Sequence, residues 1–457
     1  MKKIILLVVL TSVFSDCKKN SSNVTPPPTN NNSVAGQYGT PYTGVPDVKD
    51  IVMYEVNIRA FSPADNFAGI ETRLDSIKAL GVNVIWLMPT YPIGQQKSIN
   101  SPYCVQNDTE VNNEFGTLAD LRSFVSMAHT KGMAVILDWV TDGTSWDNIW
   151  IGNTSWYNLT TSGAIEQYGS YTDIAALNYN NPTMEAAQIH GMEYWLLQAN
   201  VDGFRCDNAD SEPDAFWTTA INSISTLNHK LILLAEGSKT SHFTSGFQMD
   251  YSWTYFTALS KVFAGSSAVI LNPTNTTDNN GTPAGTYMLR FTTNHDEDYD
   301  YGIGGTPISL FGGLSGSIAA FALVATMGGV PLIYDGQEVG CATPLDYFGT
   351  STIINWGENI NVSGAYEQII AFRIANDAVK EGAVTDFSSS NVCAFERTAS
   401  GDTVMIVVNV RNSAQTFTLP AAVANTSWYD GLNSNASLSL TTSVTLQPYQ
   451  YMLLKKQ

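Results

Sequence analysis

Residues 201–207 read Val-Asp-Gly-Phe-Arg-Cys-Asp, a short and mostly apolar run that ends on a carboxylate. Seven further runs of β-branched or aliphatic residues lie between residues 51 and 334, and segments with helical spacing of apolar residues separate them. Short strands that alternate with helices are the pattern of a parallel α/β sheet. The eight expected strands are 51–56, 82–88, 133–138, 201–206, 231–236, 247–250, 288–293 and 331–334.

Eight such strands over about 290 residues predict a (β/α)8 TIM barrel of class α/β, whose catalytic groups stand at the C-terminal ends of the strands. The segment 118–131 has the apolar spacing expected of a crossover helix. Four acidic residues fall at or just after strand ends, and we expect them to meet at one mouth of the barrel: Asp138, Asp207, Glu236 and Asp296.

The rest of the chain divides by composition. Residues 141–182, after the third strand, are too long for an ordinary barrel loop and rich in Trp, Tyr, Asn and Thr, which predicts a small inserted subdomain. From about residue 384, alternating strands with turn signals predict a C-terminal antiparallel β-sandwich domain. The expected organisation is a signal peptide over 1–17, a disordered tether over 18–46, a catalytic barrel over 47–383 and a β domain over 384–457.

The overall charge excludes one class of partner. The chain has 22 Lys and Arg against 41 Asp and Glu, a formal charge of -19, so its field repels polyanions and nucleic acid is not an expected partner. Aromatic residues make up 11% of the chain, and flat apolar rings are surfaces on which sugar rings pack. Most of these rings are nevertheless expected in the core.

The first residues predict export. Lys2 and Lys3 precede an apolar run over 4–10, which is too short to span a bilayer. Cys17 follows this segment and resembles the lipidation site of bacterial lipoproteins, although Asp16 departs from the usual Gly or Ala. We expect an exported lipoprotein anchored to a membrane, in the periplasm or at the cell surface; the alternative is ordinary secretion with an incidental Cys17.

Two carboxylates at neighbouring strand ends indicate a reaction class. Retaining glycoside hydrolysis needs one carboxylate at the anomeric carbon and one protonated acid at the leaving oxygen, about 5–5.5 Å apart. The fourth and fifth strands of a barrel are neighbours, so Asp207 and Glu236 can meet this requirement. The alternative is that acids at strand ends are only solvated.

Three segments in order resemble the motifs of glycoside hydrolase family 13, the α-amylase family. Residues 203–207 (GFRCD) resemble the nucleophile segment, 234–237 (LAEG) the acid/base segment and 291–296 (FTTNHD) the third-carboxylate segment. The resemblance covers about residues 50 to 457, with the C-terminal domain matched by type only. Further matching segments are YEVN at 54–57, GVNVIWLMP at 81–89, EFGT at 114–117, LN at 177–178 with NP at 181–182, and GVPLIY at 329–334 with GQE at 336–338.

The resemblance implies retaining, endo-acting hydrolysis of α-1,4-glucosidic bonds in starch-like glucans and maltooligosaccharides. It implies Asp207 as nucleophile, Glu236 as acid/base and Asp296 as third catalytic carboxylate. Arg205 lies two residues before Asp207 on the same side of the strand, so we expect it to hold the nucleophile ionised. Crowding by carboxylates is expected to favour the protonated form of Glu236. The implied substrate-binding residues are Arg205, His295, Tyr103 and Asn294.

The sequence departs from the family pattern after the third strand. A sugar-binding His of the family is replaced by Gly143, and if that slot is empty, Gly143→His should raise activity on maltooligosaccharides. Asp142 stands where relatives have an Asn that often ligates calcium, and a carboxylate can also serve. Ala176, however, replaces a common acidic ligand. No cofactor is required by the expected chemistry, and calcium stays open with Asp142 as its candidate ligand.

Two alternatives to an endo-acting hydrolase remain. A transglycosylase or an exo-acting α-glucosidase uses the same scaffold, and the sequence does not separate these activities. A non-catalytic glycan-binding protein is the other alternative. Retention of all three carboxylates and Arg205 argues against it, because a binder has no chemical need for them.

Overall fold

The computed structural model describes residues 36–227, 229–299 and 304–456. The predicted signal peptide, Cys17 and residues 18–35 of the predicted tether lie outside the described residues. No helix within the described ranges is long and apolar enough to cross a membrane. Residues 36–46, which their composition assigned to the tether, pack on the barrel instead, since Tyr42 stacks on His129 and Val45 is buried.

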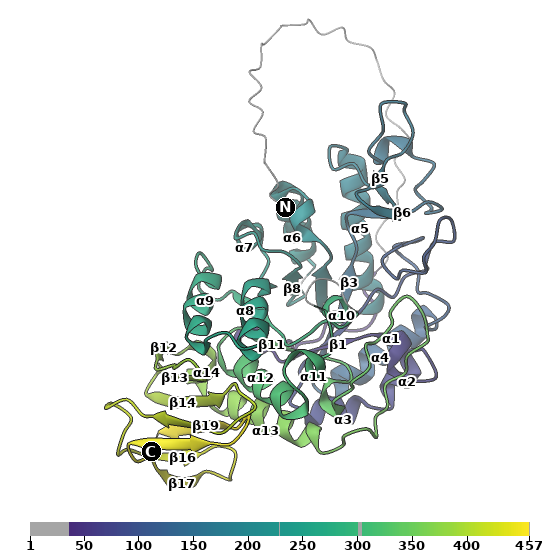
Figure 1. Ribbon diagram of the computed structural model, residues 1–457. Helices are drawn as coiled ribbons and strands as arrows, with labels where there is room; N and C mark the ends of the chain where they lie inside the picture. Colours follow the sequence, from purple (N-terminus) through teal and green to yellow (C-terminus); the bar gives the residue numbers. More distant parts are fainter. Residues whose placement is uncertain (1–35, 228, 300–303, 457) are drawn as a thin grey trace, which may run out of the picture. The chain divides into compact units, whose positions relative to one another are not determined.

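Eight parallel strands close into a barrel in the order β1-β11-β10-β9-β8-β7-β3-β2 (Figure 1), which confirms the predicted (β/α)8 fold. Every strand residue except Tyr287 is buried, and this explains why the strands read as apolar runs without polar alternation. The strands are β1 (Met53–Val56), β2 (Val84–Leu87), β3 (Ala134–Trp139), β7 (Gly203–Cys206), β8 (Ile232–Ala235), β9 (Met249–Tyr251), β10 (Tyr287–Arg290) and β11 (Val330–Tyr334).

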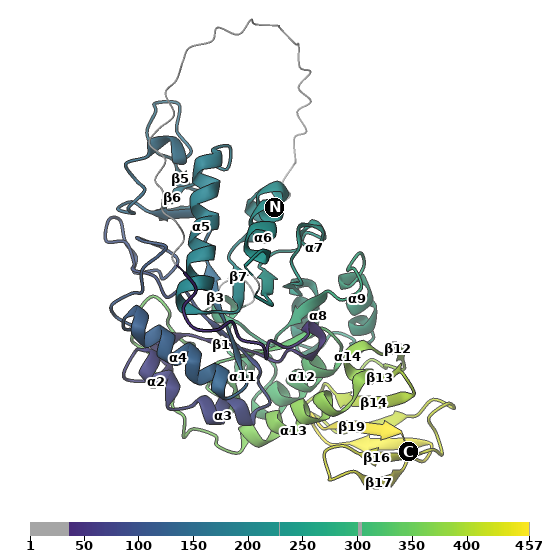
Figure 2. The ribbon, with the colours of Figure 1, turned by 180° about the vertical axis from the view of Figure 1, so that it is seen from behind.

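Helices follow most of the strands and surround the barrel (Figures 1 and 2). Helix α4 (Leu118–Thr130) shows how the sequence places them, because Thr117 and Asp120 form a capping box at its start and its buried residues share one face. The other helices are α1 (Ile58–Phe61), α2 (Phe67–Glu71), α3 (Leu74–Ala79), α5 (Pro182–Ala199), α6 (Asp214–Ser225), α7 (Ser241–Ser245), α8 (Trp253–Phe263), α9 (Leu271–Asp278), α10 (His295–Asp298), α11 (Pro307–Leu310), α12 (Leu314–Thr326), α13 (Val362–Ala375) and α14 (Asp377–Glu381).

The inserted subdomain between β3 and α5 is built on a three-stranded sheet in the order β4-β6-β5. Its strands are β4 (Gly143–Ser145), β5 (Gln167–Tyr168) and β6 (Tyr171–Ala176). The subdomain has an apolar cluster of its own around Tyr157 and Leu177, with tryptophans packed at its margin. The subdomain therefore packs around its own small core and lies beside the C-terminal end of the barrel.

The C-terminal domain is antiparallel, as predicted. Alternate residues of β13 point to opposite faces of its large sheet: Cys393 and Phe395 join the barrel core, whereas Val392 and Ala394 join the domain's own core. The six-stranded sheet contains β12 (Ala383–Asp386), β13 (Val392–Ala399), β14 (Asp402–Asn409), β19 (Tyr451–Lys456), β16 (Ser427–Asp430) and β17 (Ala436–Ser439), and β15 (Gln415–Thr418) pairs with β18 (Ser443–Leu446).

Gly203 at the start of β7 has no room for a side chain. Its φ is 147°, and a Cβ there would overlap the carbonyl oxygen of Ile232 in β8. Gly203→Ala is therefore expected to destabilise the protein by about 2–4 kcal/mol, because the backbone of two barrel strands must move. The free energy of unfolding in denaturant measures this loss.

Gly364 in α13 provides the matched control, since a Cβ there meets no described atom within 4 Å. Gly364→Ala is expected to raise the free energy of unfolding by up to about 1 kcal/mol. Equal stabilities of the Gly203→Ala and Gly364→Ala variants would contradict the close strand contact at Gly203.

Candidate active site

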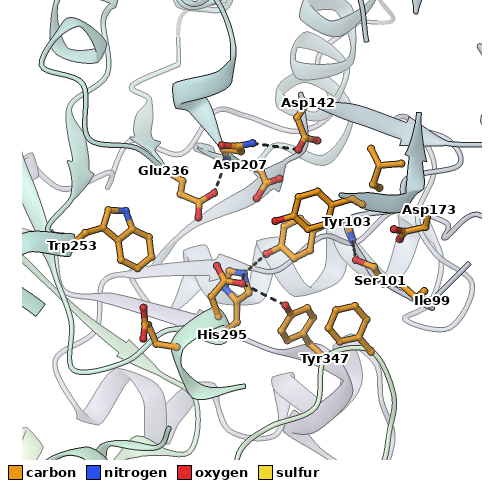
Figure 3. A pocket seen from close by; sticks show the side chains of 16 residues that line it. Ile99, Ser101, Tyr103, Asp142, Asp173, Asp207, Glu236, Trp253, His295 and Tyr347 are labelled. Atoms are coloured by element: carbon orange, nitrogen blue, oxygen red, sulfur yellow. Dashed lines mark hydrogen bonds and ion pairs between the residues drawn. The ribbon is translucent and has the colours of Figure 1, made fainter. Parts of the chain in front are cut away.

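A cavity of about 360 Å³ opens at the C-terminal ends of the barrel strands (Figure 3). The cavity brings together the three carboxylates that were predicted from the sequence to be catalytic, Asp207, Glu236 and Asp296. Their side chains are 14%, 17% and 30% exposed, so each faces the cavity while the rest of the residue is packed. The other lining residues are Ile99, Ser101, Tyr103, Asp142, Tyr171, Asp173, Ile174, Asn208, Trp253, His295, Glu297, Tyr347 and Phe348.

Arg205 lies fully buried beneath two of these carboxylates. Its Nη1 contacts Asp207 Oδ1 at 2.6 Å and Asp138 Oδ1 at 2.8 Å, and its Nη2 lies 2.8 Å from Glu236 Oε2. Burial opposes the charge of the guanidinium, but the surrounding acids raise the pKa of Arg205, which keeps it protonated. Arg205 therefore positions the acids and, contrary to the sequence-based prediction, offers no exposed surface to a sugar.

Asp207 and Glu236 each stand one residue beyond a barrel strand. The amide of Asp207 donates to Trp139 O at 2.9 Å and the amide of Glu236 donates to Cys206 O at 2.9 Å, so both continue the ladder of the barrel. Because both carboxylates contact one guanidinium, they are held as close neighbours. The backbone N–H of Asn208 also donates to Glu236 Oε2 at 2.6 Å.

Burial raises the pKa of Asp207 well above its ordinary value. Arg205 lowers that pKa, but burial has the larger effect and the carboxylates of Glu236 and Asp142 add to it, so the expectation that Arg205 holds Asp207 ionised is not confirmed. Three carboxyl groups, those of Asp138, Asp207 and Glu236, thus share the single guanidinium of Arg205. A ligand that develops positive charge next to Asp207 is favoured by this imbalance.

His295 connects the third carboxylate to the floor of the site. Its Nδ1 lies 2.5 Å from Glu55 Oε1, and its Nε2 lies 2.8 Å from the Tyr103 hydroxyl and 3.4 Å from Asp296 Oδ1. Burial alone would lower the pKa of His295, but the charges of Asp296 and Glu55 prevail and raise it to about 9. His295 is therefore a cation at neutral pH.

Tyr103 is stacked on His295, with ring centroids 5.4 Å apart, and both side chains line the cavity, while their binding of substrate stays a prediction. The Tyr103 hydroxyl also donates to Asp138 Oδ2 at 3.1 Å. Asn294, predicted to bind substrate, is fully buried and its side chain accepts hydrogen bonds from the amides of Asp296 and Glu297. Asn294 therefore caps α10, and that prediction is wrong in the described structure.

Asp142 is the candidate calcium ligand, and its contacts test that role. Its Oδ2 accepts from the Asn208 amide at 3.5 Å, and the same amide donates to the Tyr168 hydroxyl at 2.7 Å. An N–H group thus faces Asp142 where a cation needs oxygen lone pairs, and burial raises the pKa of Asp142 to about 6. The described residues contain no group of three Asp, Glu, His or Cys that could hold a metal. These contacts do not fit a calcium ion at Asp142.

Several residues in or next to the cavity were not predicted from the sequence. Trp253 lies two residues after the end of β9, so its place after a barrel strand was a usable signal. Glu55 does not line the cavity, but it contacts His295 from below, and its position as an acid inside the fully buried strand β1 was a usable signal. Tyr347 and Phe348 lie on the long loop between β11 and α13, where no local pattern marks them.

Comparison with known proteins gives consistent matches. The family model described as "Alpha amylase, catalytic domain" matches residues 61–161. Alpha-amylase MalA of Haloarcula japonica is 26% identical over 428 residues, which cover 89% of this chain and 62% of that protein. Alpha-amylase 2 of Dictyoglomus thermophilum is 22% identical, over 85% of this chain and 70% of that protein. The chain thus spans less than two thirds of the length of the Haloarcula relative.

Solved structures agree on the fold. The crystal structure of an alpha-amylase from Lactobacillus plantarum superposes with a TM-score of 0.80 at 23% identity and covers 90% of this chain and 100% of that one. An alpha-amylase from Geobacillus thermoleovorans, complexed with acarbose, gives a TM-score of 0.77 at 18% identity over 90% of this chain and 99% of that one.

Gly143 does not mark an empty slot, which overturns the expectation of a gain from Gly143→His. Gly143 pairs with Ala176 in the subdomain sheet, and a Cβ there would overlap the Ile174 side chain and lie 2.7 Å from the carbonyl oxygen of Ala175. The variant is expected to lose about 1–3 kcal/mol of stability together with activity. Thermal unfolding measures the effect, with Gly152→His as control because no described atom lies within 4 Å of a Cβ at Gly152. If the Gly143→His variant were as stable as its control, the hypothesis of an empty substrate-binding slot at Gly143 would stand again.

His295 gives the site a pH-dependent stability. An unfolded histidine has a pKa of about 6.5. Because the folded pKa is raised to about 9, protonated His295 stabilises the fold fully below about pH 6.5, and this contribution is lost as pH rises through about 9. The free-energy gap between the wild type and His295→Gln should shrink by about 3 kcal/mol between pH 6 and pH 10. A gap that stays constant with pH would show that folding does not raise the pKa of His295.

Proposed function

Because the chain belongs to the α-amylase family of glycoside hydrolases, we propose that it hydrolyses α-1,4-glucosidic bonds of starch-like glucans and maltooligosaccharides with retention of configuration. The observation that carries this proposal is the cluster of Asp207, Glu236 and Asp296 around one cavity, with Arg205 fixed beneath it. Solved structures of similar fold are described as complexes with acarbose, maltose or maltotriose, which supports an α-glucan as substrate.

The proposed mechanism gives each carboxylate a role. Asp207 attacks the anomeric carbon and forms a covalent glycosyl-enzyme intermediate, while protonated Glu236 gives its proton to the leaving oxygen. Glu236 then takes a proton from the water that hydrolyses the intermediate. The excess negative charge of the cluster stabilises the oxocarbenium-like transition state, and Asp296 with His295 is placed to bind hydroxyl groups of the same sugar.

Two other outcomes share this machinery. A transglycosylase differs only in letting a sugar acceptor replace water at the intermediate, and an exo-acting enzyme differs in where along the glucan it cuts. The catalytic contacts are compatible with internal cleavage, with chain-end cleavage and with transfer. A non-catalytic glycan-binding protein is disfavoured, because the buried charge network around Arg205 is costly and serves chemistry rather than recognition.

We also propose export and attachment to a membrane through a lipid on Cys17, facing either the periplasm or the exterior. This rests on the sequence of the first 17 residues alone. Metabolic labelling of the wild-type chain with a radioactive fatty acid tests it, and an unlabelled, freely secreted chain would contradict it.

Asp207→Asn removes the nucleophile with little change in volume and is expected to lower turnover of starch by roughly 10⁴-fold or more while leaving the melting temperature nearly unchanged.

Glu236→Gln should lose comparable activity on starch but retain far more on α-glucosyl fluoride, whose leaving group needs no proton. Asp75→Asn is the control, since Asp75 is 88% exposed and outside the cavity. The assignments fail if Asp207→Asn keeps more than a small fraction of activity, or if Glu236→Gln loses equally on both substrates.

A further inference from the structure

Two loops that line the cavity are joined to each other on one side of it. The loop after β2 contributes Ile99 and Ser101, and the loop after β11 contributes Tyr347 and Phe348. Between these pairs stands Asn100, whose side-chain amide donates to the carbonyl oxygen of Phe348. The two loops therefore contact each other directly at Asn100 and Phe348.

A buried arginine reinforces this junction from below. Arg59 is 3% exposed, and its Nη1 donates to the carbonyl oxygens of Asn100 at 2.9 Å, Tyr347 at 3.1 Å and Phe348 at 3.2 Å. Glu114 holds the same guanidinium through two contacts of 2.8 and 2.7 Å. A buried charge that is paired and fully hydrogen-bonded is hard to displace, so the junction is a fixed part of the fold.

The same loop is joined on its other side to the inserted subdomain. Ile93 and Cys104 pack with Ile174 of β6 in one apolar cluster, and the Cys104 thiol donates to the carbonyl oxygen of Asp173 at 3.3 Å. A backbone bond from Ser145 to the loop adds to this contact. The wall is consequently continuous from β6, through the loop after β2, to the loop after β11.

The positions of the proposed catalytic groups indicate which end of a bound glucan faces this wall. In Figure 3, Glu236 lies toward Trp253 at one end of the cavity, whereas Ile99, Ser101 and Asp173 lie at the other end. The acid must reach the glycosidic oxygen, so the leaving part of the glucan lies on the Glu236 side. The sugars that remain bonded to Asp207, and the non-reducing end beyond them, lie toward the continuous wall.

From this arrangement we propose that the non-reducing side of the cavity is a closed end. The enzyme then releases short products from non-reducing chain ends instead of cutting internal bonds. Asp173 accepts hydrogen bonds from the hydroxyl groups of the terminal sugar. This deepens the proposed function and rests on it. An internal segment would have to continue through the wall, whereas a terminal sugar has a free 4-hydroxyl group.

Asp173 is placed to recognise that hydroxyl group. It is 2% exposed, lines the closed end and forms no ion pair with the Lys, Arg and His side chains that the structure describes. A carboxylate accepts hydrogen bonds from two neighbouring hydroxyl groups of a sugar, and the loss of such a charged contact is felt strongly in a desolvated site. Asp173 therefore has the chemistry to favour a chain end over a blocked end.

The test compares two forms of maltoheptaose, each labelled at the reducing end: one with a free non-reducing end and one with a 4,6-O-ethylidene group on it. The wild type is expected to cleave the blocked form at least tenfold less efficiently in kcat/KM, and its first labelled products from the free form should be only slightly shortened chains. Equal kcat/KM for the two forms, or early products of all lengths, would overturn the closed end.

Two variants examine the residues that build this end. Asp173→Asn should lower kcat/KM on the free form about tenfold or more while changing it little on the blocked form, so the preference nearly disappears. Asn100→Gly keeps the left-handed backbone at φ 65° but removes the bond to Phe348, and it should raise relative activity on the blocked form. Ile149→Ala, exposed and outside the cavity, is the control. A preference unchanged in both variants would overturn the assignment.

Binding separates this inference from the proposed function. Glu236→Gln is titrated calorimetrically with free and with ethylidene-blocked maltotriose, which requires no turnover. Tighter binding of the free form supports the closed end even if hydrolysis of α-glucans is never seen, a result that would defeat the proposed function alone. Equal binding of both forms overturns the closed end whatever the activity.

Discussion

The contact of buried Arg205 with Asp138, Asp207 and Glu236 is the constraint on which the site depends. One cation cannot neutralise three carboxylates, and burying charges is costly unless each is paired and hydrogen-bonded. The surroundings meet this demand, since Asp138 also accepts hydrogen bonds from Trp86 and Tyr103. The barrel thus fixes its reactive groups before substrate arrives, and the remaining negative charge suits a cationic transition state.

The inserted subdomain is tied to this cluster through one residue. Asn208 has a left-handed backbone with φ 44°, and its N–H holds Glu236 while its side chain joins Asp142 to Tyr168 of the subdomain. The side-chain amide of Asn208 thus links Asp142 to Tyr168 through hydrogen bonds. The orientation of Glu236, the proposed acid/base, is consequently coupled to the placement of the inserted subdomain beside the cavity.

The sequence was sufficient for the parts of the site that local patterns determine. Asp207 and Glu236 could be predicted because each directly follows a buried strand, and a parallel barrel brings such positions together. Asn294 was misassigned because a motif shows adjacency in the chain and not the direction of a side chain, which here caps a helix. Gly143 was misread because its space is filled by Ile174, on a strand about 30 residues away whose pairing the sequence does not reveal. The bond from Arg59 to Phe348 joins residues 289 apart, and no local pattern signals it.

The C-terminal sheet has a consequence for the independence of the domains. One face of β13 and β14 supplies Cys393, Phe395 and Ile406 to the same apolar core as the barrel, and Arg397 donates to carbonyl oxygens of Met327 and Ala378. Without that sheet the barrel would expose an apolar face and leave buried carbonyl groups unpaired. The two domains therefore share one cooperative unit, and the β domain is an integral part of the fold instead of an appendage that could be exchanged or lost.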